Sequence, residues 1–245
     1  MELNTIHNGD CRDILKSMPD KSVDLIVTSP PYNMNLRVRN GKHCSRQITK
    51  ELTTKYEDYP DNLSMEDYYQ LNKKVITECI RISPLTFYNV QFLTGNKQAL
   101  YRIMGHFAEN IKEFIIWDKI NAEPAIGKGV LNSRFEVLLV FANKEYAITR
   151  QFKKCNFNRG ELQNLWQIKR GKKITSVNGA VFPEDLANQI IYNFSDKGDI
   201  VLDPFGGTGT TAVVCKKLGR KYILIEKGKH YIDIIEERLS SVQEM

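Results

Sequence analysis

The chain has 245 residues and a formal net charge of +6, and 42% of its residues are hydrophobic. These values are typical of an ordinary soluble globular protein. No apolar run approaches the roughly 20 residues of a membrane span, and the N-terminal residues lack the layout of a signal peptide. The five cysteines are scattered without a C-x-x-C pair, which argues against a zinc site or a disulfide framework and favours a cytoplasmic, metal-free protein.

The predicted elements alternate along the chain. Short apolar runs predict strands at residues 23–28, 85–92, 114–117, 135–141, 200–202 and 222–225. Longer amphipathic segments predict helices at residues 66–82, 96–107, 183–194, 210–218 and 229–242. This alternation favours an α/β fold with a mostly parallel twisted sheet and helices on both faces. We expect one domain that spans residues 1–245.

Two polar, basic segments interrupt this alternation, at residues 33–62 and 143–178. Residues 33–50 contain five Lys or Arg and no acidic residue, and residues 143–178 contain nine Lys or Arg and two Glu. Long irregular segments in a compact domain are usually functional or mobile. We therefore place both outside the sheet, the first as a mobile loop. Such charge suggests a surface that faces a polyanion, although a pair of solvated basic loops would give the same pattern.

The first motif with chemical meaning is SPPYN at residues 29–33, directly after the first predicted strand. Proline cannot continue a central strand, so Ser29 and Tyr32 are expected at its carboxyl edge, where ligands bind in open α/β sheets. Pro30 and Pro31 leave a stiff loop of outward carbonyls. This loop suits a flat substrate with an NH₂ group, whose hydrogens bond to the Ser29 hydroxyl and a proline carbonyl while the Tyr32 ring stacks on its face. A strand-ending turn without chemistry is the alternative interpretation.

The second motif is IVLDPFGGTGTT at residues 200–211, in which a short apolar strand leads into a glycine-rich turn and a helix. It matches neither a Walker P-loop nor the dinucleotide fingerprint. Glycines let a ligand approach the backbone, and a helix N-terminus favours the negative end of that ligand. A charged amino-acid moiety with a sulfonium would suit this site. The next strand ends at Glu226, roughly 20 residues after Asp203, where related nucleotide folds place the acid that binds a ribose hydroxyl.

Together these motifs resemble those of the DNA amino-methyltransferases that use S-adenosylmethionine. Residues 28–32 resemble the catalytic motif of that family, and residues 201–211 resemble its cofactor motif. The catalytic motif comes first, as in the circularly permuted β class, and the resemblance runs from about residue 6 to residue 240. It implies a single Rossmann-like methyltransferase domain in which residues 143–178 are a small target-recognition insert.

The resemblance also implies roles for individual residues. Catalytic roles fall to Ser29, Pro30, Pro31 and Tyr32. The implied cofactor-binding residues are Asp10, Cys11, Ser29, Phe182, Pro183, Asp203, Phe205, Gly207, Thr208, Gly209, Thr210 and Glu226. From the basic segments we predict DNA contacts by Arg37, Arg39, Lys153, Lys154, Arg159, Lys169, Arg170, Lys172 and Lys173.

The implied reaction transfers a methyl group from S-adenosylmethionine to the exocyclic amino group of a base flipped out of double-stranded DNA. Methylation of cytosine carbon 5 would instead need a cysteine nucleophile, usually after a proline, and no cysteine here follows a proline. Serine at position 29 is the usual residue of N4-cytosine enzymes, so we favour cytosine N4. Adenine N6 remains the alternative.

Other functions remain open at this point. Methyltransferases of RNA or of protein amide nitrogen carry a similar proline loop, but they generally place the glycine loop before it. A non-catalytic nucleic-acid-binding module is a further alternative, against which the intact Asp203, Gly207, Gly209 and Glu226 argue. A homodimer and a cognate restriction endonuclease are candidate partnerships.

Overall fold

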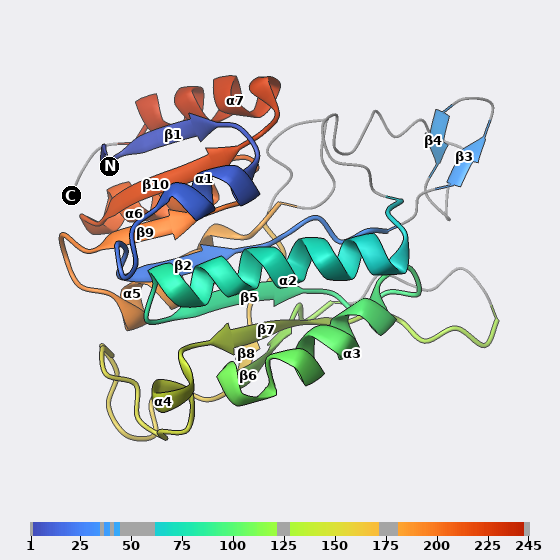
Figure 1. Cartoon of the computed structure of the whole chain (residues 1–245), viewed down its shortest axis with the longest axis horizontal. Coiled ribbons are helices and arrows are strands. Elements are labelled where there is room, and N and C mark those ends of the chain that lie inside the picture. The colour runs from blue at the N-terminus through green and yellow to red at the C-terminus, as the bar shows by residue number, and fades with distance from the viewer. Residues whose placement is uncertain are drawn as a thin grey trace.

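The computed structural model describes residues 2–34, 37–39, 42–44, 62–121, 128–171 and 181–242. Its core is an eight-stranded sheet (Figure 1). In spatial order the strands are β1 (Thr5–Asn8), β10 (Lys221–Glu226), β9 (Ile200–Asp203), β2 (Leu25–Thr28), β5 (Thr86–Val90), β7 (Phe135–Phe141), β6 (Ile111–Asp118) and β8 (Leu165–Gln167). Strand β7 is antiparallel to its two neighbours, and every other pair is parallel. The predicted α/β fold with a mostly parallel sheet is therefore confirmed.

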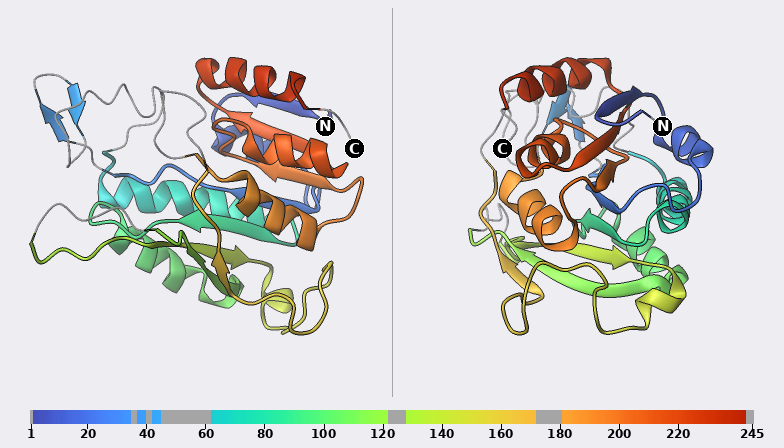
Figure 2. Two further views of the ribbon diagram at one scale, coloured as in Figure 1. Left: turned by 180° about the vertical axis from the view of Figure 1, so that it is seen from behind. Right: turned by 90° about the vertical axis from the view of Figure 1, so that its left-hand side faces the viewer.

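Helices cover both faces of the sheet (Figures 1 and 2). One face carries α1 (Cys11–Ser17), α2 (Met65–Ile82) and α3 (Lys97–His106), and the other carries α5 (Glu184–Phe194), α6 (Thr210–Leu218) and α7 (Lys229–Ser240). The short helices η1 (Ala108–Asn110) and α4 (Lys144–Ala147) flank β6 and β7. No helix in the described part of the chain is long and apolar enough to cross a membrane.

The side chains of the central strands alternate between two hydrophobic clusters, as the period of two in a strand requires. In β2, Ile26 packs in the cluster under α1, α2 and α3, whereas Leu25 and Val27 pack in the cluster under α5. In β5, Tyr88 packs in the first of these clusters and Phe87 packs in the second. Because both faces are buried, these strands are rich in apolar residues. All six predicted strands are present.

The five predicted helices are also present, but one expectation about the basic segments is wrong. Residues 143–178 were expected to lie outside the sheet, whereas β8 is its edge strand and pairs with β6. Within residues 33–62, β3 (Arg37–Arg39) and β4 (Lys42–Cys44) form an antiparallel ribbon. The predicted mobility of the loop at residues 33–62 stays a prediction, since most of these residues lie outside the described part.

Candidate active site

The predicted catalytic and cofactor motifs meet at one edge of the sheet, where the carboxyl ends of β1, β10, β9, β2 and β5 lie together (Figure 1). The SPPY loop follows β2, and the glycine loop follows β9. In Figure 1 this edge is on the right, and both termini lie on the left. This is the edge at which ligands of open α/β sheets bind.

Neighbouring side chains hold the SPPY loop through its backbone. The Tyr68 hydroxyl of α2 donates to the Pro31 carbonyl at 3.0 Å, and the Asn96 amide donates to the Tyr32 carbonyl at 2.6 Å. Asn33 adopts a left-handed φ of 52°, and its side chain bonds to the backbone of Leu63. The loop therefore has a fixed shape, and within the described part of the chain no hydrogen bond reaches the carbonyl of Pro30.

Behind this loop lies a buried polar network that ends at Ser29. The Ser29 and Tyr32 hydroxyl oxygens are 2.9 Å apart, and the Tyr32 hydroxyl donates to Glu136 Oε2 at 2.7 Å. The Asn89 amide nitrogen donates to Tyr32 Oη at 2.6 Å and to Glu136 Oε2 at 2.8 Å. Lys119 Nζ lies 3.2 Å from Glu136 Oε1. Tyr32 is only 7% exposed, so these contacts fix its ring; stacking of a base on that ring stays a prediction.

Sequence reasoning missed the deeper members of this network. Asn89, Lys119 and Glu136 are all buried. Of the three, Glu136 carried the clearest signal, because it is a charged residue inside the apolar strand predicted at residues 135–141. Charged residues are almost never fully buried unless they are paired.

Asp203 joins the two motifs. Its carboxylate accepts hydrogen bonds from the Thr28 hydroxyl at the end of β2, from the Phe205 amide and from the Thr211 hydroxyl, at 2.7, 3.0 and 2.7 Å. Asp203 is 5% exposed, and burial raises its pKa above the ordinary value. We predicted a cofactor contact for this residue, whereas its carboxylate faces the protein and ties the catalytic strand to the glycine loop.

The glycine loop is closely packed against its neighbours. Gly209 has a φ of +79°, and a Cβ placed there would lie 2.8 Å from Ile235 Cγ2 of α7. Gly207 donates its amide to Glu226 Oε2 at 2.7 Å, and Gly228 donates to Glu226 Oε1 at 2.8 Å. Burial raises the pKa of Glu226 above its ordinary value. The predicted residues Phe205, Thr208 and Thr210 lie in or directly after this loop, and Arg238, which the sequence did not single out, donates to the Thr208 carbonyl.

The other predicted cofactor residues lie at the same edge in different environments. Asp10 caps α1 and binds Arg12 through both carboxylate oxygens, and the Arg12 side chain holds the pKa of Asp10 below its ordinary value. The Cys11 side chain is 1% exposed and belongs to the core, so it offers no open face to a ligand. Phe182 is half-buried and Pro183 caps α5.

The basic residues predicted to bind DNA lie at both ends of the sheet. Lys154 pairs with Asp24 and Asp199, which precede β2 and β9, so it lies at the edge opposite the motifs. Lys153 packs over the Tyr146 ring of α4, also at that opposite edge. The structure thus separates these two residues from the site, contrary to our expectation.

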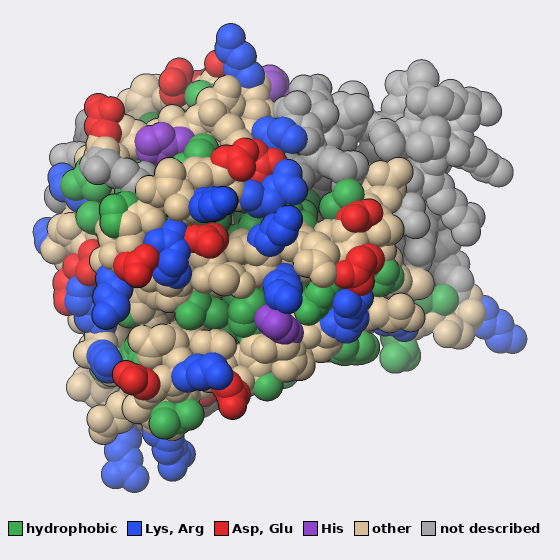
Figure 3. Space-filling view, viewed as in Figure 1, with side chains coloured by type: hydrophobic (Ala, Val, Ile, Leu, Met, Phe, Trp, Pro, Cys, Tyr) green, Lys and Arg blue, Asp and Glu red, His purple; other side chains and the backbone are tan. Residues whose placement is uncertain are grey.

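Lys169 and Arg170 follow the carboxyl end of β8 and are exposed on the motif side, and Arg159 is exposed in the turn before β8. The structure does not describe the side chains of Arg37, Arg39, Lys172 and Lys173. On the face covered by α1, α2 and α3, basic and acidic side chains are interspersed (Figure 3). The described residues of that face therefore form no uniformly basic surface.

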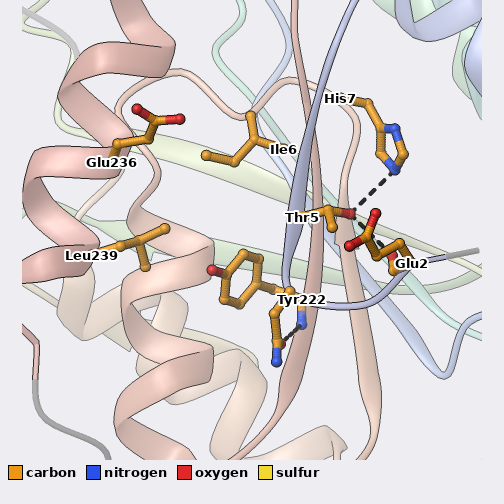
Figure 4. Close-up of a pocket in the computed structure, with 8 residues that line it drawn as sticks. Glu2, Thr5, Ile6, His7, Tyr222, Glu236 and Leu239 are labelled. Atoms are coloured by element: carbon orange, nitrogen blue, oxygen red, sulfur yellow. Dashed lines mark hydrogen bonds between the residues drawn. The ribbon is translucent and has the colours of Figure 1, made fainter.

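A shallow surface hollow of about 450 Å³ lies beside β1, β10 and α7 (Figure 4). Its lining includes Thr5 and Tyr222, at the amino ends of their strands, and Glu236 of α7. None of the predicted site residues lines it, and it lies away from the edge that carries the motifs.

Comparison with known proteins agrees with this arrangement. Residues 23–237 match the family described as DNA methylase, N6_N4_Mtase. The chain is 33% identical over 263 residues to the type II methyltransferase M.HinfI of Haemophilus influenzae, covering 98% of this chain and 69% of that protein. It is 28% identical over 277 residues to the type II methyltransferase M.BglII of Bacillus subtilis, covering 97% and 69%.

Two solved structures share the fold. The PvuII DNA methyltransferase (cytosine-N4-specific) superposes with a TM-score of 0.72 at 19% identity, covering 100% of this chain and 89% of that one. The M1.HpyAVI–SAM complex superposes with a TM-score of 0.66 at 21% identity, covering 96% and 98%. With its paired SPPY and glycine loops and this family match, the chain belongs to the S-adenosylmethionine-dependent DNA methylases that methylate an exocyclic amino group.

Proposed function

We propose that this chain methylates the N4 amino group of a cytosine flipped out of double-stranded DNA, at a specific short sequence. The observation that carries the proposal is the buried carboxylate of Asp203, which bonds to Thr28 on one side and to Thr211 on the other. The loop that would accept the amino group is therefore joined to the loop that would hold the methyl donor. Their adjacency supports a methyl-transfer site between them.

The residues around the glycine loop fit S-adenosylmethionine. Helix α6 begins after Gly209 without a side-chain cap, so its first N–H groups are suited to the carboxylate of the methionine moiety. The Glu226 carboxylate accepts backbone hydrogen bonds from Gly207, Gly228 and Lys227, and its two oxygens retain a lone pair for a ribose hydroxyl. Gly209 leaves no room for a side chain at the loop. When bound, the cofactor supplies an electrophilic methyl group on a sulfonium.

The SPPY loop supplies the acceptors for the amino group. The lone pair of an exocyclic nitrogen is delocalised into the ring, so the nitrogen is a poor nucleophile until its hydrogens are held. The Ser29 hydroxyl and the Pro30 carbonyl can accept these hydrogens, which orients the lone pair and stabilises the positive charge that develops. The nitrogen would then gain the methyl group that the bound cofactor supplies, while the Ser29 hydroxyl and the Pro30 carbonyl hold its hydrogens, and one of its two protons would leave to solvent.

Serine at position 29 supports cytosine N4 as the target, with adenine N6 as the alternative. Transfer of tritiated methyl groups to duplex DNA, followed by separation of the nucleosides, distinguishes them. We expect the label in N4-methylcytosine. Label only in N6-methyladenine would refute the choice of base and leave amino-methylation intact, whereas DNA without label would refute both.

DNA contacts are proposed at the motif edge. Lys169 and Arg170 are exposed there after β8. Arg159 comes before the amino end of β8, so its predicted DNA contact rests on the sequence alone. The contacts assigned to Arg37, Arg39, Lys172 and Lys173 rest on the sequence alone. Lys153 and Lys154 are excluded from the proposed set because they lie at the opposite edge.

We also propose a cytoplasmic location, since a bacterial enzyme of this kind acts on DNA in that compartment. A cognate restriction endonuclease is a proposed partner, in keeping with the type II names of the relatives. A homodimer remains a proposal from the small size of the recognition segment. Sedimentation of the free chain and of the DNA complex would test it, with a monomer in both as the contrary result.

A further inference from the structure

The buried network behind the SPPY loop contains two charges that the proposed transfer does not yet use. Glu136 is 8% exposed and Lys119 is 2% exposed, and their side chains lie 3.2 Å apart. A buried ion pair is weak support for stability, because desolvation of both groups offsets their attraction. The pair also lies directly behind Tyr32, whose hydroxyl donates to Glu136. A role in the chemistry would explain why a costly buried ion pair lies at the site.

The carboxylate fixes the direction of every hydrogen bond in the chain that leads to Ser29. A carboxylate only accepts hydrogen bonds, so the Tyr32 hydroxyl, 2.7 Å away, gives its one proton to Glu136. The Asn89 amide nitrogen donates to Tyr32 Oη and to Glu136 Oε2. Within the described residues the Asn89 carbonyl oxygen has no partner, and turning the amide over would place that oxygen against the carboxylate.

It follows that Tyr32 Oη can only accept from its remaining neighbours. The Ser29 hydroxyl, 2.9 Å from Tyr32 Oη, must then give its own proton to Tyr32. Ser29 is half-buried; the Asn89 amide nitrogen lies 3.5 Å from its oxygen, and a second lone pair of that oxygen is left for a ligand at the sheet edge. A hydroxyl can ordinarily donate or accept, but because the Ser29 proton is given to Tyr32, this hydroxyl can only accept from a ligand.

We infer that Glu136 is a positioning residue, which acts through Tyr32 to make Ser29 an obligate hydrogen-bond acceptor for the target amino group. The inference rests on the proposed function. An amino group presents hydrogens and suits this acceptor, whereas a base with a carbonyl oxygen at the same position would set two acceptors against each other. The network would therefore help both to hold the amino nitrogen and to reject bases without one.

A double-mutant cycle between Ser29 and Tyr32 tests this coupling. Tyr32→Phe keeps the ring but removes the hydroxyl, and we expect single-turnover methyl transfer to duplex DNA to slow about 10- to 100-fold. Ser29→Ala should slow it by at least as much. Because Tyr32 acts through Ser29, the double variant should be no slower than Ser29→Ala. Tyr192→Phe, which removes an exposed phenol on α5, is the matched control and should leave the rate unchanged.

Glu136 needs its own variant, because Glu136→Gln would leave the buried Lys119 ammonium beside a neutral amide and so endanger folding. The pair Lys119→Met with Glu136→Leu removes both charges together, a replacement that proteins commonly tolerate. We expect it to slow transfer as much as Tyr32→Phe does, and adding Tyr32→Phe should have no further effect. Thermal unfolding and cofactor affinity, measured by calorimetry, should match those of the wild type.

The outcomes separate the two proposals. Multiplicative rate effects of Ser29→Ala and Tyr32→Phe in an active enzyme would overturn the coupling and leave the proposed function standing. A wild-type rate for the charge-free pair would likewise overturn the role of Glu136. A folded wild-type chain that binds the cofactor but transfers no methyl group to any DNA would overturn the proposed function, and this inference with it.

Discussion

Gly209 offers the sharpest test of how the cofactor loop is built. Its φ of +79° lies in the left-handed region, and an added Cβ would lie 2.8 Å from Cγ2 and 2.9 Å from Cγ1 of Ile235. Ile235 is fully buried in α7, so it has little room to move. Gly209→Ala therefore meets both a backbone penalty and a packing penalty.

The size of each penalty follows from general values. A non-glycine residue in the left-handed region costs about 1–2 kcal/mol, and overpacking of a close-packed site costs about 1–3 kcal/mol. We expect Gly209→Ala to lower the free energy of unfolding by about 2–5 kcal/mol, measured by urea titration. Displacement of the loop should also weaken S-adenosylmethionine binding by at least about tenfold, measured by calorimetry.

Two further variants separate the penalties. Gly160 has a φ of +86° with nothing within 4 Å of an added Cβ, so Gly160→Ala should show the backbone penalty alone. Ile235→Ala removes the two clashing carbons, so in its presence Gly209→Ala should cost about 1–3 kcal/mol less. If Gly209→Ala matched Gly160→Ala in stability and bound the cofactor normally, the close packing of this loop would be refuted.

Three other predictions concern the carboxylates and the charged surface. Asp203→Ala leaves three donors without their acceptor and should lower the free energy of unfolding by about 3 kcal/mol or more, whereas Asp203→Asn should cost clearly less, both measured by urea titration. Burial raises the pKa of Glu226, so cofactor affinity should fall as pH decreases through a value above 4.5, since only the ionised carboxylate accepts the ribose hydroxyls fully; in Glu226→Gln, calorimetry should show no such dependence. Replacing Lys172 and Lys173 with alanine should weaken DNA binding at every sequence and reduce the slope of log affinity against log salt by about 2.

Each of these has a contrary outcome. Equal stability losses for the two Asp203 variants would mean that its hydrogen bonds contribute little. A pH profile of affinity shared by Glu226→Gln and the wild type would assign the titration to another group. The control replaces Arg150 and Lys153 with alanine; both are exposed near α4 at the opposite edge. It removes the same charge and should leave the salt slope unchanged. A reduction equal to that of the Lys172 and Lys173 variant would contradict DNA binding at the motif edge.

Much of the fold could be predicted because its central strands are buried on both faces. Strands β2, β7 and β9 are apolar nearly throughout, so local composition identified them. Strand β1 has the sequence TIHN and is half-exposed, and in β8 only Trp166 is buried. Edge strands like these need little apolar sequence, and only their pairing with β10 and β6 defines them.

The candidate site likewise has a part that the sequence predicts and a part that it does not. The SPPY and glycine loops could be predicted because proline and glycine restrict the backbone locally, whatever the rest of the chain does. Asn89, Lys119 and Glu136 could not, because β5, the end of β6 and β7 bring them together only through the sheet register. Lys154 was misplaced for a related reason: charge counted along the sequence does not show to which end of the sheet a residue belongs.

Base-resolution sequencing of modified DNA from cells that express the chain tests the central claim most directly. We predict N4-methylcytosine at one short sequence, and its absence from cells that express Ser29→Ala at an equal level. DNA without a methylated amino group, from cells in which the folded wild-type protein is present, would contradict the claim.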